Sequence, residues 1–318
     1  MNARLPLLLL ALGACVRPSA VQRDAAALNG PPDAPVARLP DGGVACGVCP
    51  GGYVARGGAV AVHADSLDEV SGVVESRRTP GVLFVHNDSG DGPRFFAIGP
   101  DGRKAGEYHL RGATAVDWED IALGPCPAGA CVYLGDIGDN DAARAEAVIY
   151  RVPEPPTTGG DDLDVAWDAL PFRYPDGTHN AETLLVHPTT GDLYVVTKVA
   201  AGASGVYVLR APHAPGPVRT AERVATLNLP PDGGQLVTGG DLHPCADRLL
   251  LRTYVALYEY ERPAGAPFEA IFAAAPRAVA VVNERHGEAV GWRADGRGYV
   301  TTSEGAHQPV NAFGCAAP

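Results

Sequence analysis

The sequence predicts an all-β protein whose strands form a β-propeller of five blades. Short runs rich in β-branched and aromatic residues are separated by turns rich in Gly, Pro, Asp and Asn, and helical periodicity is nearly absent. These runs recur in five units of similar order, each with an acidic residue at its head. Repetition at this length is typical of propeller blades, which are small sheets that pack face to face around a channel.

The repeat is visible at two points of every unit. An acid beside small or apolar residues opens the first strand: Glu69-Val70-Ser71-Gly72, Trp118-Glu119-Asp120-Ile121, Ala181-Glu182-Thr183-Leu184, Gly240-Asp241-Leu242 and Gly287-Glu288-Ala289-Val290. Polar residues end the second strand: Asn87-Asp88, Asp136, Lys198, Arg252 and Glu304. From opening acid to polar end the step is 16 residues in three units, 18 in the first and 11 in the fourth. Successive openings lie 47 to 62 residues apart, which is the length of a four-stranded blade with ordinary loops.

The individual strands are expected in chain order around β-rich runs at 82–85, 132–134, 193–196, 249–251 and 298–300. Turns such as Pro100-Asp101-Gly102 and Ala294-Asp295-Gly296 have hairpin chemistry. Segment 52–63 is expected to supply the last strand, which closes the ring against the carboxy-terminal strand. A six-bladed ring with one diverged repeat is an alternative. A β-sandwich is another, although a sandwich does not require an acid at the head of each unit.

The first residues predict export and lipidation. Arg4 precedes an apolar run at 5–12, which is too short for a membrane span of roughly 20 residues. Leu12-Gly13-Ala14-Cys15 has the pattern of a lipobox: an apolar residue, two small residues and the cysteine that receives the lipid. We therefore expect a lipoprotein signal peptide at 1–14 and a lipidated Cys15. An ordinary cleaved signal followed by a chance cysteine is the alternative.

Residues 15–43 are expected to form a disordered tether and residues 44–318 a single propeller domain. The tether is rich in Ala, Pro, Asp and Arg without an apolar period, so it cannot bury enough surface to offset its ordering entropy. Val16, rather than Asp, follows the lipidated cysteine, which favours the outer membrane. The predicted location is therefore the cell envelope, with the protein attached by its lipid anchor.

Composition and cysteine usage fit an exported protein. The net charge of -12 argues against nucleic acid as a partner. Apart from Cys15 there are six cysteines, an even number that favours disulfides in an exported chain. Cys126 and Cys131 flank a Pro-Ala-Gly-Ala turn and are the first candidates for a short bridge. Cys46 and Cys49 could instead form a redox pair or half a zinc site, but no matching context follows.

In a propeller, the start of the first strand and the end of the second lie at the same end of the channel. The repeated acids should therefore converge there and raise each other's pKa values unless a positive charge compensates. A calcium ion would suit such oxygen ligands. The candidate metal ligands are Glu69, Glu119, Asp120, Asp136, Asp139, Glu288 and Glu304. The candidate ligand-binding residues are Asn87, Asp88, Glu182, Lys198, Asp241 and Arg252.

Lys198 and Arg252 could also neutralise part of the ring directly, and a channel merely plugged by salt bridges is the alternative to a cation site. The segment 135–140 resembles a calcium loop in composition but lacks the spacing and closing Glu of an EF-hand. Its glycines, like Gly90, could simply build turns. No hydrolase or phosphate-binding motif is present, so Asp136 and His86 are the candidate catalytic bases.

Four motifs together resemble a known family. They are Asn87-Asp88-Ser89-Gly90-Asp91, Asp117-Trp118-Glu119-Asp120-Ile121-Ala122, Gly135-Asp136-Ile137-Gly138-Asp139-Asn140 and Ile149-Tyr150-Arg151-Val152-Pro153-Glu154-Pro155. They are similar to motifs of a largely uncharacterised family of secreted bacterial β-propeller proteins, over residues 65 to 305. More distantly the chain resembles phytase-like and related calcium-binding propellers. The resemblance implies a propeller with a polar central site and does not imply a reaction.

Two functions follow from these observations. In the first, the domain is a binding module of the cell envelope, with a calcium ion in its acidic centre and an unidentified ligand or envelope protein as partner. In the second, it is a metal-dependent hydrolase of phosphoesters or lactones, with Asp136 or His86 as base. The small number of basic residues near the predicted site and the lack of an obvious nucleophile favour binding.

Overall fold

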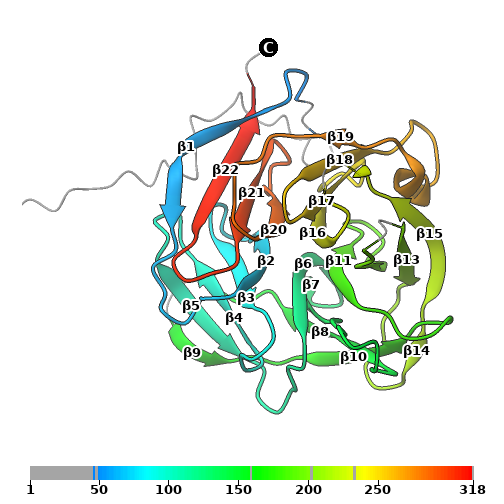
Figure 1. The fold of residues 1–318 in the computed structure, drawn as a ribbon. Helices are drawn as coiled ribbons and strands as arrows, with labels where there is room; N and C mark the ends of the chain where they lie inside the picture. Colours follow the sequence, from blue (N-terminus) through cyan, green and yellow to red (C-terminus); the bar gives the residue numbers. More distant parts are fainter. Residues whose placement is uncertain (1–45, 47–48, 158–159, 201–202, 232–233, 317–318) are drawn as a thin grey trace, which may run out of the picture.

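The computed structural model describes residues 46, 49–157, 160–200, 203–231 and 234–316. Cys15, the predicted signal peptide at 1–14 and the tether at 15–43 lie outside the described residues. Within the described part, five small sheets surround a central axis, which confirms the predicted five-bladed β-propeller (Figure 1). The innermost strands of neighbouring blades contact one another and close the ring.

Each blade consists mainly of consecutive antiparallel strands that run from the channel outward. Blade one contains β2 (Val70–Glu75), β3 (Leu83–Asn87), β4 (Arg94–Ile98) and β5 (Lys104–His109). Blade two contains β6 (Trp118–Cys126), β7 (Gly129–Asp136), β8 (Ala147–Pro153) and β10 (Asp168–Arg173). Blade three contains β11 (Ala181–Val186), β12 (Leu193–Thr197), β13 (Ala203–Leu209) and β15 (Glu222–Asn228). Blade four contains β16 (Val237–Leu242), β17 (Arg248–Thr253), β18 (Leu257–Glu261) and β19 (Arg277–Ala278).

Blade five closes the ring with strands from both ends of the described chain. It contains β20 (Gly287–Trp292), β21 (Gly298–Ser303) and β22 (Pro309–Cys315), and β1 (Tyr53–Ala61) pairs antiparallel with β22 at its outer edge (Figure 1). This pairing confirms the predicted closing strand. Because the last blade needs the first strand, the ring cannot be completed until both ends have been placed.

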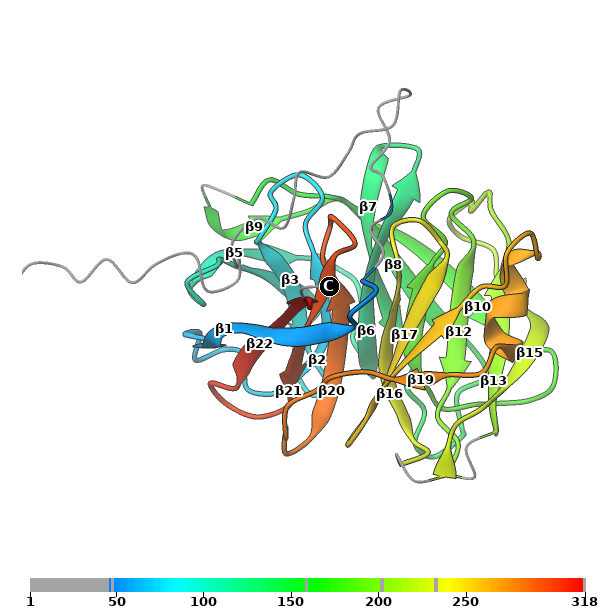
Figure 2. The same ribbon diagram turned by 90° about the horizontal axis from the view of Figure 1, so that it is seen from above.

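Two short strands tie neighbouring blades together at their outer edges. Strand β9 (Gly160–Asp164) leaves blade two and pairs in parallel with β5 of blade one, and β14 (Arg219–Thr220) pairs in parallel with β10 of blade two. The 3-10 helix η3 (Phe268–Ala273) contacts β15 and β18, which links blades three and four. Seen from the side, the β6–β7 hairpin extends beyond the neighbouring strands (Figure 2).

Interfaces between blades form the hydrophobic core. In one of them Phe84 and Phe95 of blade one pack with Trp118 and Tyr150 of blade two, and all four side chains are buried. Comparable clusters lie between the other blades. Burial of large side chains contributes about 1.5–3 kcal/mol each, so the blade interfaces supply most of the driving force for folding.

Three disulfides are present among the described residues. Cys126 bonds with Cys131 across the hairpin turn, as expected. Cys46 bonds with Cys245, and Cys49 bonds with Cys315 at the end of β22. Cys46 and Cys49 are therefore each joined to a distant cysteine, which excludes the redox-pair and half-zinc-site alternatives. The two long-range bonds fasten the segment before β1 to blades four and five.

A β-bulge interrupts the inner strand of every blade one residue after its start. The register shifts fall at Ser71, Glu119, Glu182, Thr238 and Glu288. The sequence-based alignment of unit four was wrong here, because β16 begins at Val237 and the bulge residue is Thr238 rather than Asp241. If Thr238 is taken as the opening residue of unit four and Tyr254 as its polar end, the step between them is 16 residues, as in units three and five. A β-bulge changes the direction in which a side chain points, so the residue at the bulge position determines which side chain lies at the end of the channel.

Candidate functional site

The bulge residues and the residues that follow the second strands gather at one end of the channel, because the first two strands of each blade are antiparallel. We call this region the channel mouth. Its polar members are Glu69, Asp88, Asp117, Glu119, Glu182, Lys198, Tyr254, Glu288 and Glu304. In blades one and four the bulge residues are Ser71 and Thr238, whose hydroxyls donate to the backbone of the next blade. Blades two, three and five supply the inner carboxylates.

Three carboxylates of the channel mouth are close enough to hold a metal ion. One oxygen each of Asp88, Asp117 and Glu119 lies within 4.8 Å of the others. Burial, and then the negative charges around it, raise the pKa of Glu119 well above its ordinary value. The pKa values of Asp88 and Asp117 are raised as well, first by burial. The cluster therefore favours a bound cation or proton over three bare charges.

Gly138 makes room for this cluster. A Cβ atom built on Gly138 would overlap Glu119 Oε1 and Asp117 Oδ2. The backbone at Gly138 is not in the left-handed region, so the close approach of the carboxylates, rather than the turn, excludes a side chain here. The Gly135-to-Asn140 motif thus supports the carboxylates through its backbone.

Glu182 lies between a negative and a positive neighbour. The negative charge of Glu182 raises the pKa of the neighbouring Glu119, after burial, so the two carboxyl groups oppose each other's ionisation. Lys198 Nζ lies 2.9 Å from Glu182 Oε1 and donates to Tyr254 Oη at 2.8 Å. Burial opposes the charge on Lys198, but Glu182 and Tyr254 raise the pKa of its ammonium group. The ammonium also lies 5.0 Å from the centre of the Tyr254 ring, within cation–π distance.

Glu288 is a buried carboxyl of the channel mouth, and one of its oxygens is unpaired within the described part of the chain. Its side chain is buried, with 8% of the residue exposed, and Oε2 has no hydrogen-bond partner among the described residues. Burial, followed by the charge of Glu182, raises the pKa of Glu288 to about 8, and Lys198 opposes this effect. The charges of Asp88 and Glu304 raise its pKa further, so Glu288 belongs to the electrostatic environment of the mouth.

Glu69 and Glu304 lie at the rim. Glu69 is exposed, and burial together with the charges of Asp68 and Glu304 raises its pKa. Glu304 Oε2 lies 3.2 Å from His286 Nδ1. These two predicted residues therefore belong to the acidic surface, but they are not members of the three-carboxylate cluster.

Asp120 and Asp241 lie deeper in the channel, and each forms a hydrogen bond with the backbone of a neighbouring blade. Asp120 accepts hydrogen bonds from the backbone N–H groups of Ile121 and Leu184, and Asp241 accepts from that of Trp292. Asp120 is 1% exposed and Asp241 is partly buried, and burial raises the pKa of Asp241 to about 7. These carboxylates bond to the inner strand of another blade, so they hold the ring rather than form part of the mouth.

The predicted sites in the Gly135-to-Asn140 motif are engaged in local structure. Asp136 accepts from the backbone N–H groups of Val116 and Asp117 and pairs with Arg144 at 2.7 Å. Asp139 accepts from the backbone N–H groups of Ala143 and Arg144. Asp136 thus orients the loop that carries Asp117, and both its carboxylate oxygens already have donors.

The remaining predicted residues also have structural contacts. His86 is fully buried beside Trp118, and burial lowers the pKa of its imidazole to about 4. The Asn87 amide group bonds to Ser66 and Asp91. Arg252 is 1% exposed, and its guanidinium group pairs with Glu284 at 2.6 Å. The repeat alignment placed Arg252 at the end of the second strand, but β17 continues to Thr253.

Sequence reasoning missed Asp117 and Tyr254 as site residues. Asp117 lies in the Asp117-to-Ala122 motif, two residues before Glu119, and Tyr254 follows the end of β17. The regular 16-residue step in unit four would have indicated Tyr254. Only the loop held by Asp136 brings Asp117 against Asp88, and no pattern in the sequence indicates that contact.

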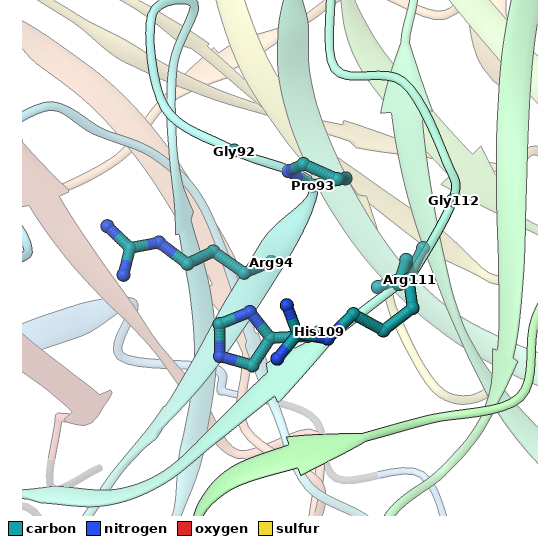
Figure 3. A pocket seen from close by; sticks show the side chains of 7 residues that line it. Gly92, Pro93, Arg94, His109, Arg111 and Gly112 are labelled. Carbon is teal, nitrogen blue, oxygen red and sulfur yellow. The ribbon is translucent and has the colours of Figure 1, made fainter.

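A second group with metal-ligating atoms lies at the outer edge of blade one. Glu107, His109 and Asp162 have ligand atoms within 4.8 Å of one another. Figure 3 shows His109 with Arg94 and Arg111 around an adjacent hollow of about 170 Å³. His109 lies 2.6 Å from Asp162, which joins β5 to β9. Arg94 and Lys104 already bond to Glu107, so this group has less uncompensated charge than the channel mouth.

No protein-family model matches the chain, and no curated protein matches it by sequence. Among solved structures the chain is similar to one described as "Crystal structure of Nidogen/Laminin Complex", with 12% identity and a TM-score of 0.42. The match covers 74% of this chain and 72% of that one. Among the described residues, no helix has the length and apolar character needed to cross a membrane.

Proposed function

We propose that this protein is a lipid-anchored binding module of the cell envelope whose channel mouth holds a calcium ion. The convergence of Asp88, Asp117 and Glu119 carries the proposal, because it assembles three oxygen donors whose pKa values are all raised by burial and by neighbouring negative charges. Calcium accepts such carboxylate sets in irregular geometry and leaves positions for water or a ligand. It would take the place of a proton as the compensating charge of the cluster, in which the pKa of Glu119 is raised by burial and by its negative neighbours.

Binding is favoured over hydrolysis by the state of the two candidate bases. His86 is fully buried, and both oxygens of Asp136 accept backbone hydrogen bonds. A general base must reach the proton that it removes, but His86 is closed off from solvent and Asp136 has no oxygen without a donor.

Calcium titration tests the ion. We expect calcium to raise the melting temperature of the EDTA-treated protein, because a ligand that binds only the folded state stabilises it. Asp117→Asn should weaken calcium binding at least about tenfold in isothermal titration calorimetry, since it removes a charged ligand. Asp101→Asn is the matched control, because Asp101 lies in the turn between β4 and β5. Equal affinity of the Asp117 variant and the control would refute the site.

The anchor needs its own experiment. An exported location is supported by the three disulfides, which persist in oxidising compartments. Cys15→Ser should move the protein from the membrane fraction to the periplasmic fraction, and mass spectrometry should find acyl chains on Cys15 of the native protein. An unmodified Cys15 in a membrane-free fraction would refute the anchor. Fractionation of inner and outer membranes tests the predicted outer-membrane location.

A further inference from the structure

The acidic surface of the channel mouth continues outward over blade one. A hollow of about 320 Å³ adjoins the mouth there, and we call it the blade-one hollow. Its lining consists of Asp65, Ser66, Asp68, Glu69, Asn87, Gly90, Asp91 and Arg94. Glu69 belongs to both regions, and its pKa responds to Asp68 on one side and to Asp88 on the other. The two regions therefore form one continuous field of negative charge.

The blade-one hollow has the size for a side chain rather than for a bare ion. Its volume is roughly ten times the ~30 Å³ share of one water molecule. Among the described residues, the carboxylate oxygens that line this hollow do not form a group close enough to hold a metal ion. Arg94, the one cation in its lining, already bonds to Asp91 and Glu107. Asp65 and Asp68 remain exposed to solvent.

Glu288 independently indicates a missing cationic partner in the channel mouth. Its Oε2 is buried and has no hydrogen-bond partner among the described residues, and the residue occupies the bulge of β20 at the mouth. The neighbouring Lys198 shows how an ammonium group is held in this region, between the Glu182 carboxylate and the Tyr254 ring. A second ammonium or guanidinium group would compensate Glu288 in the same way.

The rim of the mouth also has the apolar character of a docking surface. Val116 is 55% exposed and Val255 is 65% exposed, and both belong to the small group of large apolar side chains that are exposed in the described part of the chain. Each is adjacent in sequence to a mouth residue, Val116 to Asp117 and Val255 to Tyr254. Exposed apolar residues around a charged centre are typical of protein interfaces.

We propose that the channel mouth and the blade-one hollow together bind a basic segment of a partner protein. One Lys or Arg side chain enters the mouth toward Glu288, and a second occupies the hollow beside Asp65 and Asp68. Charge complementarity selects this partner chemistry, and the rim valines contact the apolar parts of the segment. The proposal rests on the binding role proposed above, but it does not require the calcium ion.

An acetylated tetralysine peptide is a suitable probe, with binding measured by calorimetry on the purified protein in EDTA at low ionic strength. Asp65→Asn combined with Asp68→Asn should raise the dissociation constant roughly 3- to 10-fold, as expected for two exposed ion pairs. Glu288→Gln should weaken binding by at least about tenfold at pH 8.5, where the Glu288 carboxyl is ionised and forms a buried ion pair that Gln cannot form. Raising the salt concentration to 0.5 M should weaken all binding.

Asp101→Asn combined with Glu222→Gln is the matched control. It removes the same charge from the opposite end of the blades, where β4 meets β5 and where β15 begins. The absence of peptide binding to the unmodified protein would overturn the proposal, as would an equal loss in the control. Calcium titration of the same variants separates the two hypotheses. Peptide binding without calcium binding would overturn the ion site alone. Calcium binding without peptide binding would overturn the basic partner alone.

Discussion

Glu288 should destabilise the folded protein at neutral pH, so its replacement by Gln should be stabilising. The side chain is buried, its Oε2 has no partner among the described residues, and its pKa is raised from 4.5 to about 8. At pH 7 the folded protein therefore holds a proton that the unfolded chain has released. Because the pKa is raised on folding, the contribution to stability is fully present below pH 4.5 and is lost as pH rises toward 8.

The magnitude follows from the distance between pH 7 and the ordinary pKa of 4.5. Each pH unit in this interval costs about 1.4 kcal/mol, so Glu288 lowers the free energy of unfolding by about 3 kcal/mol at pH 7. Glu288→Gln keeps the shape of the side chain and removes its titration. We therefore expect the variant to be about 3 kcal/mol more stable at pH 7 and about equally stable at pH 4.

Guanidinium unfolding in EDTA, followed by tryptophan fluorescence with the disulfides intact, measures this difference. Asp101→Asn is the control for loss of one exposed charge and should change stability by less than about 0.5 kcal/mol. A Glu288→Gln variant that is no more stable than the unmodified protein at pH 7 would refute the reasoning. So would a gain of the same size at pH 4, because titration could not then be its cause.

Two further predictions concern ring closure and the calcium cluster. Replacing Cys49 and Cys315 by Ser should lower the free energy of unfolding by about 4 kcal/mol, because with the Cys46–Cys245 bond intact their bond closes a loop of roughly 70 residues in the unfolded chain. Denaturant unfolding would measure the difference, and unchanged stability would contradict the closing role. Gly138→Ala should weaken calcium binding at least about tenfold in calorimetry by displacing Glu119, whereas Gly58→Ala, with open space around its Cβ, should not; equal affinities would count against the cluster.

The repeat made most of the architecture predictable. Strand runs, turns and the spacing of the repeated polar residues are local features, and they indicated five blades and a closing strand that the structure confirms. The Cys126–Cys131 bond could also be predicted from the sequence, because only a short turn separates the two cysteines. The partners of Cys46 and Cys49 were not, since they lie 199 and 266 residues away.

The repeat was less informative about the site, because register decides which carboxylate faces the channel mouth. Asp241 and Asp120 look equivalent to Glu182 in sequence, but the bulge in each inner strand turns both toward the backbone of another blade. Asp136, a predicted ligand, lies outside the three-carboxylate cluster and accepts a hydrogen bond from the backbone of Asp117. These assignments depend on a shift of one to three residues, which periodicity of two cannot resolve.

The sequence by itself thus determined that acids recur at one end of a five-bladed ring, because hydrophobic alternation and turn chemistry are encoded within each unit. Only the tertiary structure decided that Asp88, Asp117 and Glu119 form the cluster and that Glu288 Oε2 is buried without a hydrogen-bond partner among the described residues. Those properties depend on how the blades pack, since distances between blades and exclusion of water determine which charges meet and what their burial costs.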